Sequence, residues 1–215
     1  MSAEHNPYLA HHFDDIVQQR ESVSLGMWVF LLTEIMFFGG IFFSYAVYRH
    51  LYPEMFHEMS HHLDVTLGTI NTAVLLTSSL TMALAVNAAQ RGLTKRLVGM
   101  LTFTCLAGVG FLVIKFFEYK HKFHVGSVPG PLWNFENEWG DKAQLFYSLY
   151  FGATGLHGFH VLIGVVLIGV FAIKAHLGHY PKERYQPVEM VGLYWHFVDL
   201  VWIYVFPLFY LIGRY

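Results

Sequence analysis

The chain has 215 residues, of which 55% are hydrophobic and 13% are charged. Soluble domains carry roughly 25% charged residues, so this composition excludes an ordinary soluble fold. The formal net charge of −2 gives no support to a polyanion, and we expect no nucleic acid as a partner. The single cysteine leaves no pair for an intrachain disulfide. The apolar residues are gathered into blocks, which indicates a polytopic membrane protein.

Residues 1–22 form a polar, acidic N-terminal tail. The tail lacks a basic region followed by a short apolar stretch, so we expect no cleaved signal peptide. Residues 23–215 are expected to form one all-α helical bundle in the membrane. A spanning helix needs about 20 mostly apolar residues, and five stretches meet this requirement. The expected spans are residues 24–48, 67–89, 97–117, 145–173 and 188–212.

Five spans place the two termini on opposite sides of the membrane. The basic residues divide almost evenly between the two sides. However, the connector of residues 90–96, "QRGLTKR", is short and purely basic, and loops of this kind are retained inside. We therefore expect the N-terminus inside and the C-terminus outside.

Five ionisable side chains lie within the apolar blocks. Glu34 lies near the middle of the first block, His157 and His160 lie in the fourth, and His196 and Asp199 lie in the fifth. Each of the two pairs has i, i+3 spacing, which places its members on one face of a helix. Ionisable groups inside spans face the bundle or a partner rather than lipid. We expect the five to form one buried cluster that joins the first, fourth and fifth spans.

Three kinds of chemistry suit such a cluster. It could be a structural hydrogen-bond network that fixes the packing of the helices. It could ligate a metal or haem, because paired histidines on facing helices suit haem iron. It could also relay protons or hold a polar lipid headgroup, which are common roles of ionisable groups in membranes. The spacing alone does not choose among the three.

The second block carries a row of polar residues with a structural interpretation. Asn71 and Ser78 are two turns apart, with Thr77 and Thr81 beside them. Small and hydroxylated residues allow close contact between membrane helices. We therefore expect these four residues to form a packing face, and the glycines within residues 152–158 to pack closely in the same way.

Lys115 and Glu118 lie three residues apart at the end of the third block. We expect them to form an ion pair at the end of that helix, beside the lipid headgroups. The histidines outside the blocks lack cysteines and a regular ligand spacing, so they predict solvated surface rather than a metal site. These histidines are His5, His11, His12, His57, His61, His62, His121 and His124.

Four segments carry a recognisable pattern in a fixed order. The first, "EIMFFGGIFFSYAV", has its carboxylate at the start, and the second is "NTAVLLTSSLTMALA". The third, "TGLHGFHVLIG", has a Thr-Gly-x-His-Gly-x-His-Val pattern, and the last is "YWHFVDLVWIYVFPLFYL". Together they resemble the corresponding helices of the cytochrome c oxidase subunit III family, the third subunit of haem-copper terminal oxidases. The resemblance covers residues 24–215.

The resemblance implies an accessory subunit with no catalytic residue, no haem and no metal of its own. In the family's oxidases, haem and copper lie in subunits I and II. By this resemblance the chain packs mainly on subunit I, contacts other subunits including subunit II, binds phospholipid, and supports proton uptake and lasting activity. Glu34 matches the intramembrane carboxylate of the family. The family also has its N-terminus inside.

The chain departs from many members in the number of spans. Those members have seven, and this chain begins at the equivalent of the third, so the lipid sites beside the first two spans do not carry over complete. Five-span members occur among bacterial oxidases, including quinol oxidases. We therefore expect a multi-pass protein of the bacterial inner membrane, and membership of a larger respiratory assembly is left open.

The expected complex is a proton-pumping cytochrome c oxidase, because Glu rather than Asp at position 34 favours cytochrome c as the electron donor. Subunit III of a quinol oxidase and an accessory subunit of a nitric oxide reductase are alternatives within the same family. An independent b-type cytochrome or a proton-coupled transporter is an alternative from another class. Either would use the buried histidines and carboxylates directly.

Overall fold

The computed structural model describes residues 9–212, and every regular element within them is helical. Five helices are long and apolar enough to cross a membrane, which confirms the predicted all-α fold with five spans. They are α1 (Ile16–Leu51), α3 (Val65–Gln90), α4 (Thr94–His124), α5 (Ala143–His176) and α6 (Gln186–Phe206). The short elements are α2 (Pro53–His61), the single 3-10 turns η1 (Gly140–Lys142) and η2 (Lys182–Arg184), and the π-helical segment η3 (Pro207–Leu211), which continues α6.

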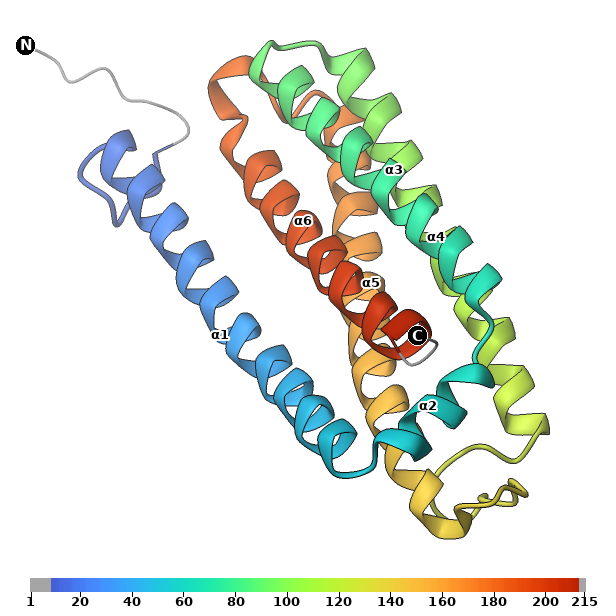
Figure 1. The fold of residues 1–215 in the computed structure, drawn as a ribbon. Coiled ribbons are helices and arrows are strands. Elements are labelled where there is room, and N and C mark those ends of the chain that lie inside the picture. The colour runs from blue at the N-terminus through green and yellow to red at the C-terminus, as the bar shows by residue number, and fades with distance from the viewer. Residues whose placement is uncertain (1–8, 213–215) are drawn as a thin grey trace, which may run out of the picture.

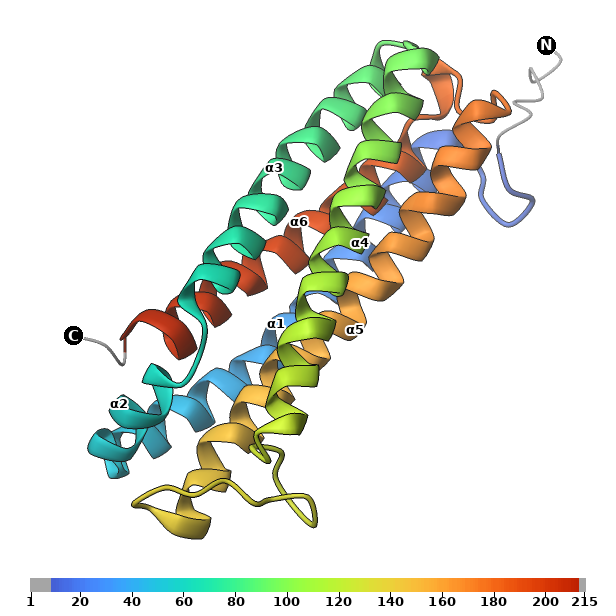
Figure 2. The same cartoon turned by 90° about the vertical axis from the view of Figure 1, so that its right-hand side faces the viewer.

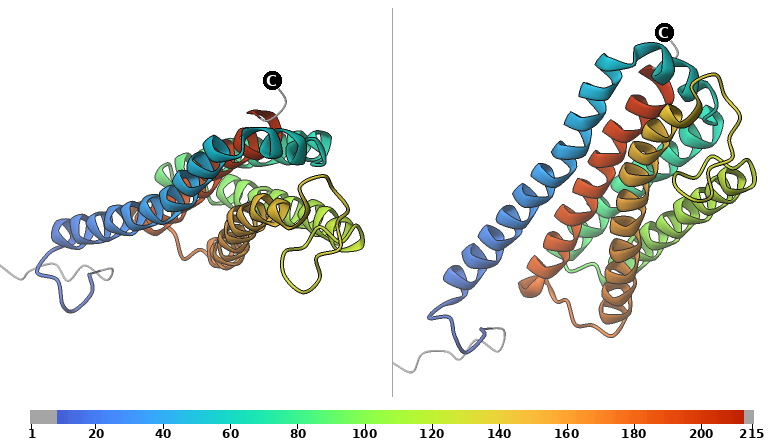
Figure 3. Two further views of the ribbon diagram at one scale, coloured as in Figure 1. Left: turned by 60° about the horizontal axis from the view of Figure 1, so that its bottom comes forward. Right: turned by 90° about the horizontal axis from the view of Figure 1, so that it is seen from below.

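Successive long helices run in opposite directions and form one bundle (Figure 1). α3 and α4 lie side by side, and α5 packs on α4 (Figure 2). α6 is the most enclosed of the long helices, and α1 lies at one edge, beside α5 and α6 (Figure 3). The start of α1 lies at the same end as the α3–α4 and α5–α6 connections. We call the opposite end, which carries α2 and residues 125–142, the α2 end.

The long helices extend beyond the predicted spans, most clearly in α1. This helix starts at Ile16, within the residues predicted as a polar tail. Its first turn is stabilised by Asp15, whose carboxylate accepts a hydrogen bond of 2.7 Å from the backbone N–H of Gln18. Residues 1–8 of the predicted tail lie outside the described residues. The start of α1 is thus set by the N-cap Asp15, and it does not coincide with the start of the apolar block.

The helix α2 lies in the first connector, where the span pattern does not reveal it. Pro53 occupies its first position, where the missing N–H costs nothing. Met55, Phe56 and Met59 point inward and are fully buried. The ring of Phe56 contacts that of Phe146 on α5 at a centroid distance of 5.3 Å. This short helix therefore closes the bundle at the α2 end.

A glycine with positive φ follows each of α3, α4 and α5. Gly92 follows α3 with φ of 72°, and Gly178 follows α5 with φ of 78°. Both positions need the left-handed conformation that glycine adopts without a Cβ clash. In the first turn the N–H of Leu93 donates to the carbonyl of Ala88 at 2.9 Å, which closes the end of α3. A turn this tight holds α4 directly against α3.

The centre of the bundle is built around Trp195, which is fully buried. A Cβ on Gly164 of α5 would lie 2.7 Å from the Trp195 ring, and one on Gly108 of α4 would lie 2.8 Å from it. These two glycines therefore make room for the indole between α4 and α5. The predicted close packing of the 152–158 glycines is wrong for Gly152 and Gly158, because a Cβ at either position would meet no neighbouring helix within 4 Å.

One narrow face of α1 makes its contacts with the bundle. Leu31, Phe38 and Tyr45, spaced seven residues apart, are buried, while the opposite face carries large exposed apolar side chains. The Tyr45 hydroxyl donates a hydrogen bond to the carbonyl of Leu208 in η3. Pro207 begins this segment, and its missing N–H accounts for the loss of α-helical hydrogen bonding there. α1 is thus joined to η3 at the α2 end, and near its start the Gln186 side chain donates to the carbonyl of Arg20 at 2.8 Å.

Candidate functional site

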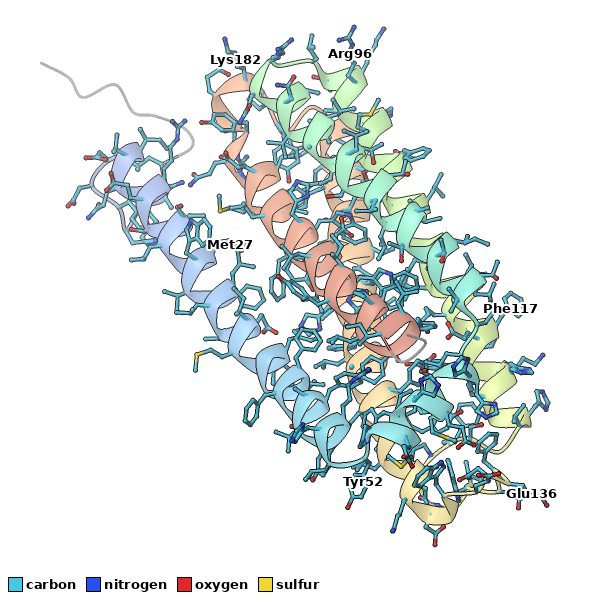
Figure 4. The ribbon with its side chains drawn as sticks, in the orientation of Figure 1. Met27, Tyr52, Arg96, Phe117, Glu136 and Lys182 are labelled. Atoms are coloured by element: carbon cyan, nitrogen blue, oxygen red, sulfur yellow. The ribbon has the colours of Figure 1, made fainter. Side chains whose placement is uncertain are left out.

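A cleft of about 860 Å³ lies between α1 and the pair α5 and α6. It runs from Gln19 and Gln186, near the starts of α1 and α6, to Glu34 and Phe37 in the middle of α1. Figure 4 labels Met27 on the α1 wall. The walls are almost entirely apolar, which suits an apolar ligand. The other lining residues are Val23, Phe30, Leu156, Phe159, His160, Ile163, Leu167, Phe171, Pro187, Met190, Val191 and Tyr194.

The inner end of the cleft holds the predicted residues Glu34 and His160. Glu34 Oε2 lies 3.1 Å from His160 Nε2, so the two side chains join α1 to α5. His160 is 8% exposed, and its ring also contacts Phe38 at a centroid distance of 5.3 Å. Its backbone carbonyl accepts a hydrogen bond from the Tyr194 hydroxyl of α6 at 3.0 Å. The imidazole is therefore fixed, while the carboxyl group sits on the cleft wall.

The donors and acceptors around His160 require one proton between His160 and Glu34. His160 Nδ1 lies 2.9 Å from the carbonyl oxygen of Leu156, which can only accept, so Nδ1 carries a hydrogen. His160 Nε2 then either accepts from a protonated Glu34 or, as imidazolium, donates to its carboxylate. Without that proton, a carboxylate would face a nitrogen lone pair. The hydrogen bond between the two side chains therefore requires one proton, in the middle of a span.

The second predicted histidine of α5, His157, points into the bundle. It is fully buried between Phe111 of α4 and Trp202 of α6, with ring centroids 5.4 and 5.1 Å away. Neither ring nitrogen has a hydrogen-bond partner within the described residues. Its contacts are those of a core aromatic side chain.

The predicted residues of α6 face α3. His196 Nδ1 lies 2.8 Å from the hydroxyl of Ser79. Asp199 is buried, and neither of its carboxyl oxygens has a hydrogen-bond partner within residues 9–212. The two side chains are therefore not bonded to each other, although they share a face of the helix.

The structure does not join the five residues into one hydrogen-bonded cluster, in contrast to the expectation. Glu34 reaches only His160 of α5, because α1 stands at the edge of the bundle. His196 turns toward α3, and His157 lies among aromatic rings. Helical spacing predicted which residues share a helix face, but it could not predict which neighbouring helix each face meets.

Lys115 and Glu118 pair, but not at an exposed helix end. Lys115 Nζ lies 2.9 Å from Glu118 Oε2, and both residues are buried, because α4 continues to His124. The ammonium also donates to the hydroxyls of Tyr210 at 2.9 Å and Tyr150 at 3.4 Å. Both tyrosines donate in turn to Glu118 Oε1. The pair therefore lies before the end of the helix, inside the bundle. Lys115, Glu118, Tyr150 and Tyr210 form a closed network, which we call the Lys115 network.

Of the four residues of the predicted packing face of α3, three are turned toward the bundle and one is exposed. Asn71 and Ser78 are fully buried, and Ser78 accepts a hydrogen bond of 3.1 Å from the Trp195 indole. The Thr81 hydroxyl lies 2.8 Å from that of Thr104 on α4. Thr77 is exposed and donates to the carbonyl of Ala73 in its own helix. One residue step rotates a helix by about 100°, which turns Thr77 out of the bundle.

The connector histidines that the structure describes are exposed. The rings of His57 and His61 on α2 contact each other edge to face, at a centroid distance of 4.9 Å. At His62, between α2 and α3, partial burial lowers the pKa, and the charge of Lys122 lowers it further. His5 lies outside the described residues.

The sequence interpretation missed the tyrosines of the Lys115 network. Tyr150 lies one heptad before His157, so it shares the buried face of α5, and this spacing was a usable signal. Tyr210 follows Pro207, where the π-helical turn changes the direction of side chains, and no regular period predicts it.

Comparison with known proteins decides the family. The family model described as Cytochrome c oxidase subunit III matches residues 3–214. The chain belongs to the cytochrome c oxidase subunit III family. The predicted resemblance is thereby confirmed over nearly the whole chain.

Relatives of this subunit III chain serve more than one kind of oxidase. Cytochrome c oxidase subunit 3 of Thermostichus vulcanus is 31% identical over 192 residues, covering 89% of this chain and 88% of that protein. Quinol oxidase subunit 3 of Bacillus spizizenii is 33% identical over 196 residues, covering 88% and 86%. A haem-copper oxidase subunit I+III of Aeropyrum pernix is 29% identical over 205 residues, covering 90% of this chain but 23% of that protein.

The subunit III family consists of non-redox accessory subunits of haem-copper oxidase complexes, and this chain is one of them. Among residues 9–212, no group of three or more His, Cys, Asp and Glu side chains is placed to hold a metal ion. Its five apolar helices make it a multi-pass membrane protein. Its described residues offer a buried hydrogen-bonded pair and an apolar cleft.

Proposed function

We propose that this accessory subunit helps to keep protons supplied to a redox centre in a neighbouring subunit of a bacterial oxidase. The observation that carries the proposal is the contact of 3.1 Å between Glu34 Oε2 and His160 Nε2 at the inner end of the cleft, which needs a proton between the two atoms. A group that holds a proton halfway along a span can exchange it with a neighbouring path. The Lys115 network does not suit this role, because each of its donors already has an acceptor.

The proposed orientation has the N-terminus inside and the C-terminus outside, in the bacterial inner membrane. The exposed Arg91, Lys95 and Arg96 of the α3–α4 turn support it, because short basic loops stay inside. Arg96 and Lys182 are labelled at this end of the bundle in Figure 4. The cleft begins at the same end. In this orientation it opens toward the side from which an oxidase takes up protons.

The main partner in this proposal is subunit I, with haem and copper held in subunits I and II. The fused subunit I+III of Aeropyrum pernix supports contact with subunit I, because fusion keeps two chains together. The exposed face of α1, with Leu25, Trp28, Leu32 and Met36, is a candidate contact surface. Subunit II and a larger respiratory assembly are further proposed partners.

The cleft is proposed to hold phospholipid. Its apolar walls match acyl chains, and its polar residues Gln19 and Gln186 lie at the outer end. A lipid there would keep bulk water from the side of Glu34, so that protons would reach it only along a defined path. The proposed electron donor is cytochrome c, because position 34 is Glu rather than Asp. The relatives include both cytochrome c oxidase and quinol oxidase subunits.

Co-purification tests the proposed assembly. A tagged chain extracted in mild detergent is expected to carry oxidase subunits I and II with their haem, and to show no haem absorption once separated from them. Haem absorption by the separated chain would favour an independent cytochrome. Co-purification with a nitric oxide reductase would also contradict the proposal.

Lipid retention tests the role of the cleft. Met190→Trp places an indole in the cleft, whereas Leu106→Trp places the same side chain on an exposed face of α4. Phospholipid retained by the purified chain is measured by phosphate analysis. Met190→Trp is expected to retain less than Leu106→Trp, at equal thermal stability. Equal retention by the two variants would argue against lipid in the cleft.

A further inference from the structure

A second recess, of about 540 Å³, lies at the α2 end and shares no residue with the cleft. It is formed where the last turn of α1 meets the start of α2 and the end of η3. Arg49 and His50 supply its basic side chains. Its other lining residues are Tyr45, Ala46, Pro53, Leu208 and Ile212.

Two hydrogen bonds fix the position of the Arg49 guanidinium. Its Nη1 donates to the hydroxyl of Tyr45 at 3.0 Å, and its Nη2 donates to the carbonyl of Ile212 at 2.9 Å. Tyr45 is itself buried, and its hydroxyl hydrogen bonds to the Leu208 carbonyl. The side chain of Arg49 is thus positioned by two elements, and not only by its own helix.

The charge of Arg49 is not neutralised within the described residues. The ion pairs of Lys115 with Glu118 and of His160 with Glu34 do not include Arg49, and within residues 9–212 no carboxylate pairs with it. A guanidinium has five N–H donors, and the two hydrogen bonds leave more than half of them for another acceptor. A basic residue in the last turn of a helix is favourable through the helix dipole alone. The dipole does not explain why the guanidinium lines a recess.

The recess lies at the end of a membrane-spanning helix, a position that suits lipid headgroups. Arg49 is two residues from the end of α1, and the exposed aromatic side chains of Tyr48 and Tyr52 flank it in sequence. Tyrosine is enriched where the membrane meets water. Ala46, Leu208 and Pro53 give the recess an apolar side. A ligand with an anionic head and an apolar body would therefore fit it.

We propose that this recess binds the phosphate group of an anionic phospholipid at the α2 end of the bundle. Phosphate oxygens accept paired hydrogen bonds from the fork of an arginine, with His50 adding a donor beside it. The glycerol and the first methylene groups lie along Ala46, Leu208 and Pro53. The inference rests on the proposed function only in taking phospholipid as the ligand, and it concerns the membrane face opposite the opening of the cleft.

Counting bound lipid on the full chain tests the site. The chain is purified in detergent micelles, titrated with phosphatidylglycerol, and analysed by mass spectrometry under native conditions. Arg49→Gln removes the charge and the fork, and we expect it to weaken the tightest lipid step by about tenfold, the value of one charged hydrogen bond. Arg91→Gln removes an exposed charge at the opposite end and is expected to change nothing. Equal titrations for wild type and Arg49→Gln would overturn the proposal.

Two further arms keep the test decisive. Arg49→Lys keeps the charge but loses the fork, so it is expected to bind between wild type and Arg49→Gln while folding like wild type. Diacylglycerol, which lacks phosphate, is expected to show no dependence on residue 49, and a dependence would overturn the proposal. Displacement of the lipid by millimolar inorganic phosphate would identify free phosphate as the ligand instead.

The result is separable from the proposed function. Because the lipid is counted on the chain itself, failure to co-purify with subunit I leaves the measurement intact. An unchanged titration for Arg49→Gln, together with lipid loss in Met190→Trp, would reject this site and leave the cleft in place.

Discussion

Two ionisable pairs lie inside the membrane-spanning helices, and they differ in how completely they are enclosed. Lys115 and Glu118 are buried inside the bundle, and two tyrosines complete their hydrogen bonds. Glu34 and His160 join α1 to α5 by one hydrogen bond, on the wall of an open cleft. Each pair joins a carboxylate to a basic side chain, but the Lys115–Glu118 pair is enclosed by the bundle and the Glu34–His160 pair borders the cleft.

The difference teaches what each pair can do. In the Lys115 network every donor has an acceptor, so a gained or lost proton would break several bonds at once. The Glu34–His160 hydrogen bond needs one proton between the two groups, and both side chains line the cleft. A closed pair fixes the packing of the helices. In the proposed function, the half-open pair exchanges its proton.

Breaking the closed pair should have the largest effect. Glu118→Ala leaves the Lys115 ammonium buried without its counter-charge, and removing one partner of a buried pair costs about 3–5 kcal/mol. We expect a large fall in the melting temperature of the purified chain in detergent and poor assembly with subunit I.

The matched control removes both charges. Lys115→Met combined with Glu118→Leu replaces the pair with apolar side chains of similar size, which is often close to neutral for stability. The double variant should therefore be more stable than Glu118→Ala alone. A double variant as unstable as the single one would show that the cost is lost packing and not an unpaired charge.

The two tyrosines should not contribute equally. The Lys115 ammonium lies 2.9 Å from the Tyr210 hydroxyl and 3.4 Å from that of Tyr150. Tyr210→Phe removes a strong partner of both charges and should cost about 1–3 kcal/mol. Tyr150→Phe should cost less. Melting temperatures of the two variants give the comparison, and a larger loss for Tyr150→Phe would contradict this ranking.

Prediction from the sequence was most accurate where one helix sufficed. The five spans and the buried positions of Asn71 and Ser78 follow from hydropathy and from the helical period, which are properties of single segments. The family followed from motif order. The caps and the short helix α2 depend on individual hydrogen bonds and on packing, which a hydropathy window does not contain.

The sequence predicted least well which side chains from different helices contact each other. Glu34, His157 and His196 each lie on a polar face, but the partner of each depends on the rotation of a neighbouring helix. In the structure Glu34 meets His160, and His196 meets Ser79. His157 lies between two aromatic rings. The charged pair of α4 was placed at a helix end, because the apolar block stops there although the helix does not.

The packing face of α3 offers a smaller test of the closed interior. Ser78→Ala removes the acceptor of the Trp195 indole N–H, which is buried, and should cost about 1–2 kcal/mol. Thr77→Val, one residue earlier on the exposed side, should change stability by no more than about 0.5 kcal/mol. Urea or thermal unfolding in detergent measures both, and equal losses would mean that Thr77 is covered after all.

Removing the titratable proton of the Glu34–His160 pair should have the smallest effect on stability, but it should change turnover. Glu34→Gln keeps the shape of the side chain, and its amide can donate to His160 Nε2 as a protonated carboxyl group does. We expect the melting temperature and assembly with subunit I to stay close to wild type, within about 1 kcal/mol. The variant has no proton to exchange at this position, so the oxidase should lose activity faster during sustained turnover.

The control for this comparison is Thr33→Val, at the exposed neighbouring position of α1. It leaves the pair intact and should turn over like wild type. Oxygen consumption followed over many turnovers, normalised to haem, separates the outcomes. If Glu34→Gln also keeps wild-type turnover, the shared proton only holds α1 against α5, and both buried pairs are structural. If activity declines while assembly persists, enclosure is what separates a structural pair from a pair that handles protons.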